Sequence, residues 1–419
     1  MGSDDAVVIQ VGKRAGEASV ITVNCPDKTG LGCDLCRTIL EFGLRISRAD
    51  VSTDGKWCYV VYWVIPCPEL GSVNWAHLKD RLLSACPSSS ISFYFDSGAR
   101  TAASQVYLLK VLCIDRKGLL NDVTRILGEL ELIIQRVKVS TTPDGRVVDF
   151  FFITDGMELL HTKQRQEETC ARLSAVLGES CETCEIQSAG PEYEIFQQGF
   201  SSLPNAVAEE LFRPDLPDNE IRSQVAVSDL TKLKKCTVSM DNSLSPAHTL
   251  LQIHCVDQKG LLYDILRTLK DCNIQVAYGR FLSDTKGCRE VDLFVQQNDG
   301  KKMVDPEKQG TLCSRLRMEM LHPLRVIVVS RGPDTELLVA NPVELSGTGR
   351  PRVFYDVTLA LMSLGICIFS AEIGRHSTAE RQWEVYRFLL DETPEFSLSS
   401  GRAQARVVDR VRRSLMGWN

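Results

Sequence analysis

The sequence predicts an α+β protein of four ferredoxin-like βαββαβ units, paired through side-by-side sheets. Three observations predict this fold: a short motif that recurs along the chain, an apolar helix pattern after each copy of the motif, and the same order of strands and helices after that. A unit of about 80 residues is small for a domain that folds alone, so the copies are expected to bury their open sheet edges against one another.

The motif is Cys-x-Asp-x-x-Gly-Leu-x-x-Asp, and it begins at Cys25, Cys113 and Cys255. It is typical of a strand end, a tight glycine turn and a helix start. A degenerate fourth copy of the motif ends at Asp356 and has Arg352 at the position that glycine holds in the other copies. Apolar residues then recur at steps of four, four and three, which places them on one face of a helix.

Each helix is followed by two strands joined by a turn, and then by a second helix. The first strands of these hairpins are predicted at 44–52, 132–141, 274–282 and 366–373, and the second strands at 57–65, 147–154, 289–296 and 382–390. The second helices are predicted at 73–86, 162–177, 306–321 and 402–415. A last strand closes three copies at 91–95, 183–187 and 324–329, whereas the fourth copy ends before any last strand.

The repeat divides the chain into four copies. These are copy one (18–96), copy two (105–188), copy three (249–331) and copy four (335–419). A proline-containing linker, 189–246, separates the second copy from the third, and we expect a short helix at 205–212 and a strand at 236–240 within it. The spacers are short within each half of the chain, so we expect copy one to pair with copy two and copy three with copy four.

Composition narrows the class of protein. The net charge of −6 disfavours a nucleic-acid partner, and no apolar run approaches the roughly 20 residues of a membrane span. The N-terminus lacks the pattern of a signal or transit peptide, which predicts a cytoplasmic protein and leaves the nucleus open. We therefore expect the 16 cysteines to be free thiols, with the motif cysteines acting as small buried hydrophobes.

Two Cys-x-x-Cys pairs, Cys33/Cys36 and Cys181/Cys184, have the composition of a four-thiolate zinc site. They are far apart in the sequence, however, and the first pair falls inside a predicted helix. We therefore expect no metal and no other cofactor.

At the motif residues the chain resembles the ACT-domain family, in particular the plant ACT-repeat proteins with four copies. The repeats also resemble the C-terminal ACT pair of bacterial uridylyltransferases that sense glutamine. The match is best at 115–120 and 257–262, and the run 241–249 also fits. The resemblance covers all of the chain except the N-terminal tail and the middle linker. It implies a regulatory protein of nitrogen metabolism that binds a small molecule, usually an amino acid, at interfaces between ACT domains.

The resemblance places the ligand on the turn after the first strand of each copy. The expected ligand-binding residues are Asp27, Gly30, Leu31, Asp115, Gly118, Leu119, Asp257, Gly260 and Leu261. A helix N-terminus suits the ligand carboxylate, an aspartate can accept from the ammonium group, and glycine lets the backbone come close. The alternative is that these aspartates only cap the helix and these glycines only serve the turn. Copy four departs from the pattern at its turn, so it is not expected to hold a site of this shape.

Other classes of protein fit less well. The six histidines form no spaced metal motif, no catalytic motif is present, and little chain remains outside the repeats, so we expect no enzyme. The aromatic strand 56–63 has the composition of an RNA-binding sheet, but the equivalent strands do not keep it. The alternative is a scaffold that binds a protein partner without a metabolite, through the linker or the basic helix at 402–413. A sensor without its own catalytic domain also needs a partner or target enzyme, and self-association stays open.

Overall fold

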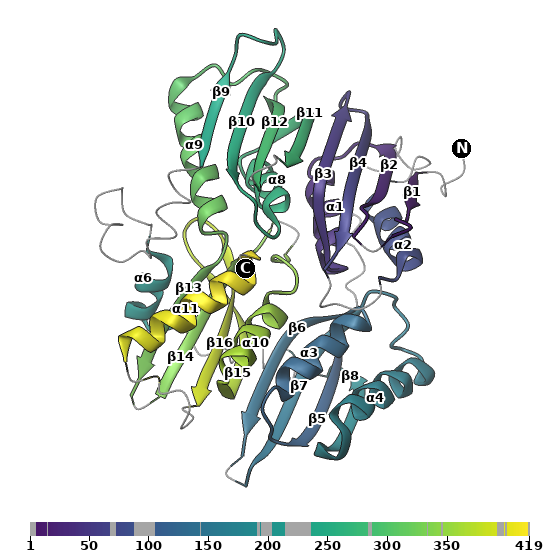
Figure 1. Cartoon of the computed structure of the whole chain (residues 1–419), viewed down its shortest axis with the longest axis vertical. Helices are drawn as coiled ribbons and strands as arrows, with labels where there is room; N and C mark the ends of the chain where they lie inside the picture. The colour runs from purple at the N-terminus through teal and green to yellow at the C-terminus, as the bar shows by residue number, and fades with distance from the viewer. Residues whose placement is uncertain are drawn as a thin grey trace. The chain divides into compact units, whose positions relative to one another are not determined.

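The computed structural model describes residues 6–417 except for 15, 68–72, 88–104, 143, 191–192, 194–202, 214–235, 284–286, 333, 345–346, 392–397 and 399. The chain divides into two compact units. Unit 1 contains Met1–Ser97 and Pro214–Pro323, and unit 2 contains Gly98–Arg213 and Leu324–Asn419. Each unit is built on one eight-stranded sheet whose neighbouring strands are antiparallel (Figure 1). The predicted α+β class of four ferredoxin-like units paired through their sheets is confirmed.

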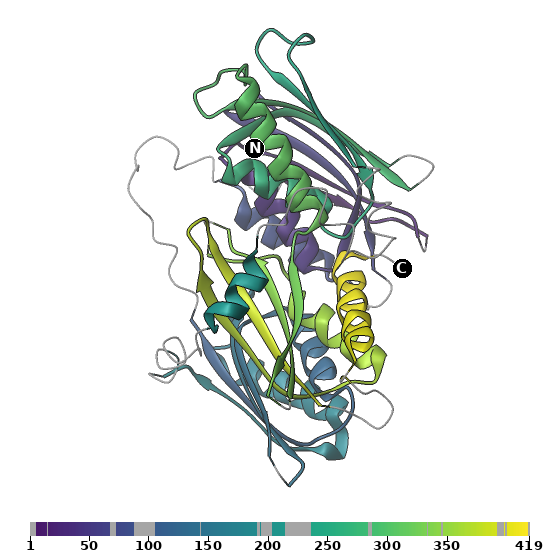
Figure 2. The same ribbon diagram turned by 90° about the vertical axis from the view of Figure 1, so that its left-hand side faces the viewer.

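Unit 1 combines copies one and three in the strand order β1-β2-β4-β3-β11-β12-β10-β9. Its strands are β1 (Val7–Gln10), β2 (Ser19–Pro26), β3 (Leu44–Thr53), β4 (Trp57–Pro66), β9 (Thr237–Asp241), β10 (Thr249–Val256), β11 (Ile274–Ser283) and β12 (Cys288–Gln297). Its helices are α1 (Leu31–Glu41), α2 (Trp75–Ala85), α8 (Leu261–Asp271) and α9 (Pro306–Leu321). Figure 2 shows these helices on one side of the sheet, where they enclose a single apolar core.

Unit 2 combines copies two and four in the order β13-β14-β16-β15-β6-β7-β5-β8. Its strands are β5 (Tyr107–Ile114), β6 (Leu132–Thr141), β7 (Arg146–Asp155), β8 (Cys181–Ser188), β13 (Arg325–Arg331), β14 (Asp334–Pro342), β15 (Cys367–Ser377) and β16 (Gln382–Asp391). Its helices α3 (Leu119–Glu129), α4 (Lys163–Leu177), α10 (Val353–Leu364) and α11 (Gly401–Met416) enclose the main core. The predicted linker helix forms as α6 (Asn205–Phe212) and packs on the opposite face of the copy-four strands (Figure 2).

The expected pairing of copy one with two and of copy three with four is wrong. Copy one joins copy three through β3 and β11, with Ala49 opposite Phe281. Copy two joins copy four through β6 and β15, with Val139 opposite Ala371. A short spacer limits how far apart two copies can lie, but it does not select which sheet edge a strand pairs with.

The prediction that 324–329 closes copy three is also wrong. That segment lies in β13, which pairs along its whole length with β14, so it completes copy four, whose last strand was expected to be missing. Copy three instead has β9 at its outer edge, and copy one has β1. Among the described strands, β8 of copy two alone is an outer strand that comes from the C-terminal side of its copy. The first strand of each βαββαβ unit has an open edge. A segment that comes before or after the unit in the sequence can pair with this edge. The predicted strand 91–95 lies outside the described residues.

The motif behaves as predicted at each glycine turn. Gly30, Gly118 and Gly260 have φ of 81°, 80° and 74° and directly precede α1, α3 and α8. The three motif cysteines are buried, as expected. Cys33 and Cys36 lie in α1 of unit 1, whereas Cys181 and Cys184 lie in β8 of unit 2, and no metal-binding group of His, Cys, Asp or Glu was found among the described residues.

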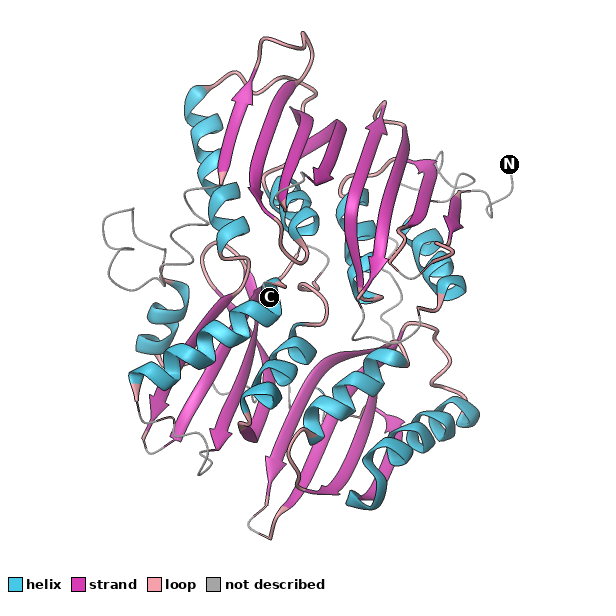
Figure 3. Cartoon of the chain, in the orientation of Figure 1, coloured by secondary structure: helices cyan, strands magenta, loops and turns pink. Residues whose placement is uncertain are grey.

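Figure 3 shows how helices and strands are distributed over the chain. None of the helices in the described part of the chain is long and apolar enough to cross a membrane.

Candidate functional site

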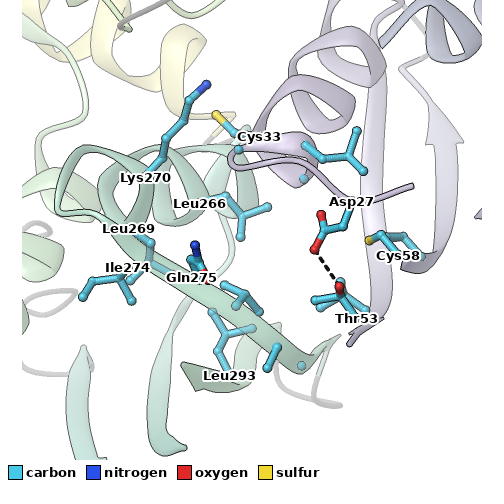
Figure 4. Close-up of a pocket in the computed structure, with 18 of the residues that line it drawn as sticks. Asp27, Cys33, Thr53, Cys58, Leu266, Leu269, Lys270, Ile274, Gln275 and Leu293 are labelled. Carbon is cyan, nitrogen blue, oxygen red and sulfur yellow. Dashed lines mark hydrogen bonds between the residues drawn. The ribbon is translucent and has the colours of Figure 1, made fainter. Parts of the chain in front are cut away.

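A cavity of about 480 Å³ lies within unit 1, between copy one and copy three (Figure 4). From copy one it is lined by the turn Asp27–Leu31 and by side chains of β3 and β4. From copy three it is lined by α8 and β11, with Leu266, Lys270 and Gln275 among the contributing residues. Its volume falls within the range of about 300–1,000 Å³ that is usual for small-molecule sites.

The turn brings the start of α1 to the wall of this cavity. A Cβ atom added at Gly30 would lie 2.6 Å from Cε of Lys270, so glycine serves both the left-handed backbone and the close approach of copy three. The first turn of a helix presents backbone N–H groups and the positive end of the helix dipole. Asp34 holds two lysines beside it, Lys28 at 2.9 Å and Lys270 at 3.4 Å. This end of the cavity therefore suits a carboxylate.

Asp27 supplies an acceptor on the same wall. Its half-buried carboxylate accepts a hydrogen bond from Thr53 Oγ1 at 2.6 Å, and its backbone N–H donates to the Lys56 carbonyl at 2.9 Å. These bonds fix the side chain at the cavity. Figure 4 shows Asp27 on the copy-one side and Gln275 on the copy-three side of the opening. Asp27 offers a carboxylate to an ammonium group, and the amide oxygen of Gln275 on the facing wall accepts from Gln296 Nε2 at 3.3 Å.

The remaining lining is mainly apolar. The apolar residues include Leu31, Ala49, Val51, Cys58, Val60, Leu262, Leu266, Leu269, Ile274, Val276, Phe281 and Leu293, together with the ring of Tyr62. Asp54, His248, Arg280 and Gln296 are polar residues that also line the cavity. Burial raises the pKa of the Cys58 thiol to about 12, so at neutral pH this cysteine presents an uncharged, unreactive surface to the cavity.

The corresponding turn of copy three is occupied by the protein itself. Arg289 stands opposite Cys255 on β12, where copy one has Cys58 opposite Cys25. Its guanidinium is 1% exposed and binds Asp257 through Nε–Oδ1 at 2.7 Å and Nη2–Oδ2 at 2.9 Å. Arg45 of copy one also pairs with Asp257. The small Cys58 leaves room for a cavity in copy one, whereas Arg289 fills the equivalent space in copy three.

The glycine turn of copy two lies at a much smaller cavity in unit 2, of about 30 Å³. The Met362 sulfur of copy four lies 3.0 Å from the position of a Cβ at Gly118. The space holds one or two water-sized groups and is too small for an amino acid. In copy four, Arg352 takes the glycine position with φ of 66°, and its guanidinium lies 5.1 Å from the Tyr355 ring centre.

The structure thus separates the nine expected ligand-binding residues into three groups. Asp27, Gly30 and Leu31 line the large cavity, and Asp115, Gly118 and Leu119 line the small one. Asp257, Gly260 and Leu261 line neither of these two cavities. Sequence reasoning missed the copy-three wall, because it paired copy one with the wrong neighbour. It also missed Arg289, although aligning the hairpin strands of the copies would have shown an arginine where copies one and two have Cys58 and Val147.

Paired ferredoxin-like units with a glycine turn at their interface define a protein built of ACT domains, and comparisons with known proteins agree. The family model for the ACT domain matches residues 107–171. Models described as "ACT domain-containing protein ACR10, N-terminal", "ACR9-like, ACT-like domain" and "ACT domain-containing protein ACR9, C-terminal" match residues 9–87, 237–334 and 335–417. None of these four models describes a catalytic domain.

The chain belongs to the family of ACT domain-containing ACR proteins. It is 63% identical over 417 residues to ACT domain-containing protein ACR9 of Arabidopsis thaliana, with 99% of each chain covered. It is 50% identical over 424 residues to ACR10 of the same plant, again with 99% of each covered. It is also 25% identical over 217 residues to a bifunctional uridylyltransferase/uridylyl-removing enzyme of Gluconobacter oxydans, over 52% of this chain and 19% of that enzyme. The resemblance to plant ACT-repeat proteins is therefore confirmed.

Proposed function

We propose that this protein is a non-catalytic regulator that binds an amino acid between copies one and three and acts through a protein partner. The observation that carries the proposal is the cavity of about 480 Å³ in unit 1, which combines a helix N-terminus, a fixed carboxylate and an apolar wall. These are the three kinds of surface that an amino acid needs for its carboxylate, its ammonium group and an apolar side chain.

The arrangement of these surfaces suggests a pose. The ligand carboxylate lies at the start of α1 near Lys28 and Lys270, and the ammonium group donates to Asp27. The ligand side chain then faces the leucines of α8 and Leu293, which favours an apolar amino acid of the size of leucine or phenylalanine. Glutamine is the second candidate, because the amides of Gln275 and Gln296 also line the cavity.

Binding at this place would act on the pairing of the two copies. The ligand would contact copy one and copy three at once, so the affinity would depend on how the two copies are packed. A ligand with different affinity for two such arrangements shifts their populations, and a partner protein that contacts either copy can respond to the shift. The family's regulatory domains supply no chemistry of their own, which is why the proposal includes a partner.

A thermal-shift screen of the full chain with the twenty amino acids tests this proposal. A ligand at about 100 times its dissociation constant is expected to add about 2.7 kcal/mol to the free energy of unfolding. Asp27→Asn removes the charge that receives the ammonium group and should lower the affinity by tenfold or more. Asp299→Asn changes an acid of copy three that is 54% exposed and lies outside the cavity lining, so this control should keep the full shift.

Two results would contradict the proposal. If none of the amino acids shifts the unfolding midpoint, the alternative of a scaffold without a metabolite replaces it. If Asp27→Asn binds as tightly as the natural chain, the ligand lies elsewhere, even though the protein is a sensor.

A further inference from the structure

Unit 2 contains a buried carboxylate that the fold does not require. Asp149 on β7 is 1% exposed, and its Oδ1 has no hydrogen-bond partner. It stands opposite Val111 on the neighbouring strand. Valine occupies the same position in copies one and three, where Val60 faces Val23 and Val291 faces Ile253. The packing of this strand is thus satisfied by valine in two copies, and copy two places an unpaired acid there.

This carboxylate lies on the small cavity beside the Gly118 turn. Asp149 and Asp115 both line it from copy two, and Thr358, Met362 and Cys367 line it from copy four. Asp149 is buried, whereas Asp115 is exposed. The volume of about 30 Å³ admits a group the size of one or two water molecules. Two carboxylates thus line one water-sized space.

Arg116 and Lys117 of the same turn also line the cavity, and a hydrogen bond from the Arg116 backbone lowers the pKa of Asp115 against the larger, opposite effect of burial. Arg116 bonds Asp122 at 2.6 Å, and Lys117 lies against Gly365, with Nζ 3.0 Å from the position of a Cβ there. Burial and then Asp115 raise the pKa of Asp149 to about 8, and burial also raises the pKa of Asp115. The other titratable groups that act on this pair are Asp391 at the end of β16 and the thiols of Cys113 and Cys367, whose own pKa values are raised by burial.

We propose that this cavity binds an ammonium group, either the free ammonium ion or the end of a primary amine, between the carboxylates of Asp149 and Asp115. The group has the size of water and donates its hydrogen bonds to the carboxylate oxygens. The thiol of Cys367 and the apolar walls from Met362, Ile366 and Ile368 suit alkali metal ions poorly, since these need several oxygen ligands. The site lies in unit 2, so it is independent of the amino-acid site proposed for unit 1.

The test is thermal unfolding of the full chain at pH 8.5 and constant ionic strength with ammonium, methylammonium, potassium, sodium or tetramethylammonium chloride. Ammonium or methylammonium at ten times its dissociation constant is expected to raise the midpoint by about 3–5 °C, and the other three cations should not. A rise with ammonium alone identifies the free ion, and an equal or larger rise with methylammonium identifies an amine terminus. At pH 6.5 the rise should be smaller, because Asp149 must lose its proton to bind.

The variants complete the test. Asp149→Val should abolish the rise in midpoint with ammonium. Asp149→Asn removes the charge with little change of shape and should abolish the rise as well, which separates the loss of the charge from any change in packing caused by valine. Asp144→Asn changes an exposed acid on the same hairpin, with 63% of its side chain exposed, and should keep the effect. Absence of any ammonium effect in the natural chain, equal effects of sodium or potassium, or an unchanged effect in both Asp149 variants would each overturn the proposal.

Discussion

Arg289→Ala is expected to lower the free energy of unfolding by about 3–5 kcal/mol, because it leaves a carboxylate at the copy interface without its main partner. Arg289 is almost fully buried and makes two hydrogen bonds to Asp257. It also donates to the Ser47 and Ile46 carbonyls of copy one and lies 4.8 Å from the Phe281 ring centre. The substitution thus removes a bond between copies as well as a charge.

Urea denaturation followed by tryptophan fluorescence measures this loss, since Trp57, Trp63 and Trp75 all lie in unit 1. Lys301→Ala, also in unit 1, is the control: its side chain is 78% exposed and it pairs with Asp299 at 3.4 Å, so its loss should cost less than about 1 kcal/mol. Adding Asp257→Val to Arg289→Met should recover part of the stability, because neither charge then remains unpaired. A loss below about 1 kcal/mol in Arg289→Ala would show that this ion pair does not hold the copies together.

Asp149→Val is expected to raise stability, by several kcal/mol at pH 8 in the absence of ammonium. Burial, and then the charge of Asp115, raise the pKa of this carboxyl from about 4 in the unfolded chain to about 8 in the folded protein. Between these values the folded state binds more protons, so the stability of the natural chain falls as pH rises, by up to about 1.4 kcal/mol per pH unit. Valine removes this slope and fills the position as it does in copies one and three.

The measurement is urea denaturation of both proteins at pH 5, 6.5 and 8. Other titrating groups are common to the two chains, so the difference between them isolates Asp149. The advantage of the valine variant should be smallest at pH 5 and should grow toward pH 8. A difference that does not change with pH would show that Asp149 ionises in the folded protein as it does in the unfolded chain.

The local structure of this protein could be predicted from its sequence because each element depends on neighbouring residues. The motif glycine directly precedes a helix in three copies. The spacing of the apolar residues after it determines which face of that helix is buried. Even the linker helix Asn205–Phe212 was predictable from its local pattern. Which copies pair was not predictable, because copies one, two and three carry the same motif and spacer length does not encode strand complementarity.

The candidate site was predictable only in part, for a similar reason. The motif places a glycine turn in three copies, but the side chain opposite the turn decides whether it borders an open cavity. Cys58, Arg289 and Met362 make the difference between a large cavity, an occupied turn and a water-sized space. Two of these residues lie outside the motif of their own copy, and Met362 belongs to a different copy from the turn that it contacts.

Along the chain, consecutive copies belong alternately to unit 1 and unit 2. Neither unit can therefore be completed during synthesis before the second half of the chain is made. β3 ends at Thr53, but its partner β11 begins only at Ile274. At about 5–20 residues per second, the ribosome exposes the unpaired edge of β3 for roughly 10–40 s before that partner emerges. A nascent chain of this protein therefore carries two open sheet edges at once, those of copies one and two, and they have to be kept from joining each other until the second half arrives.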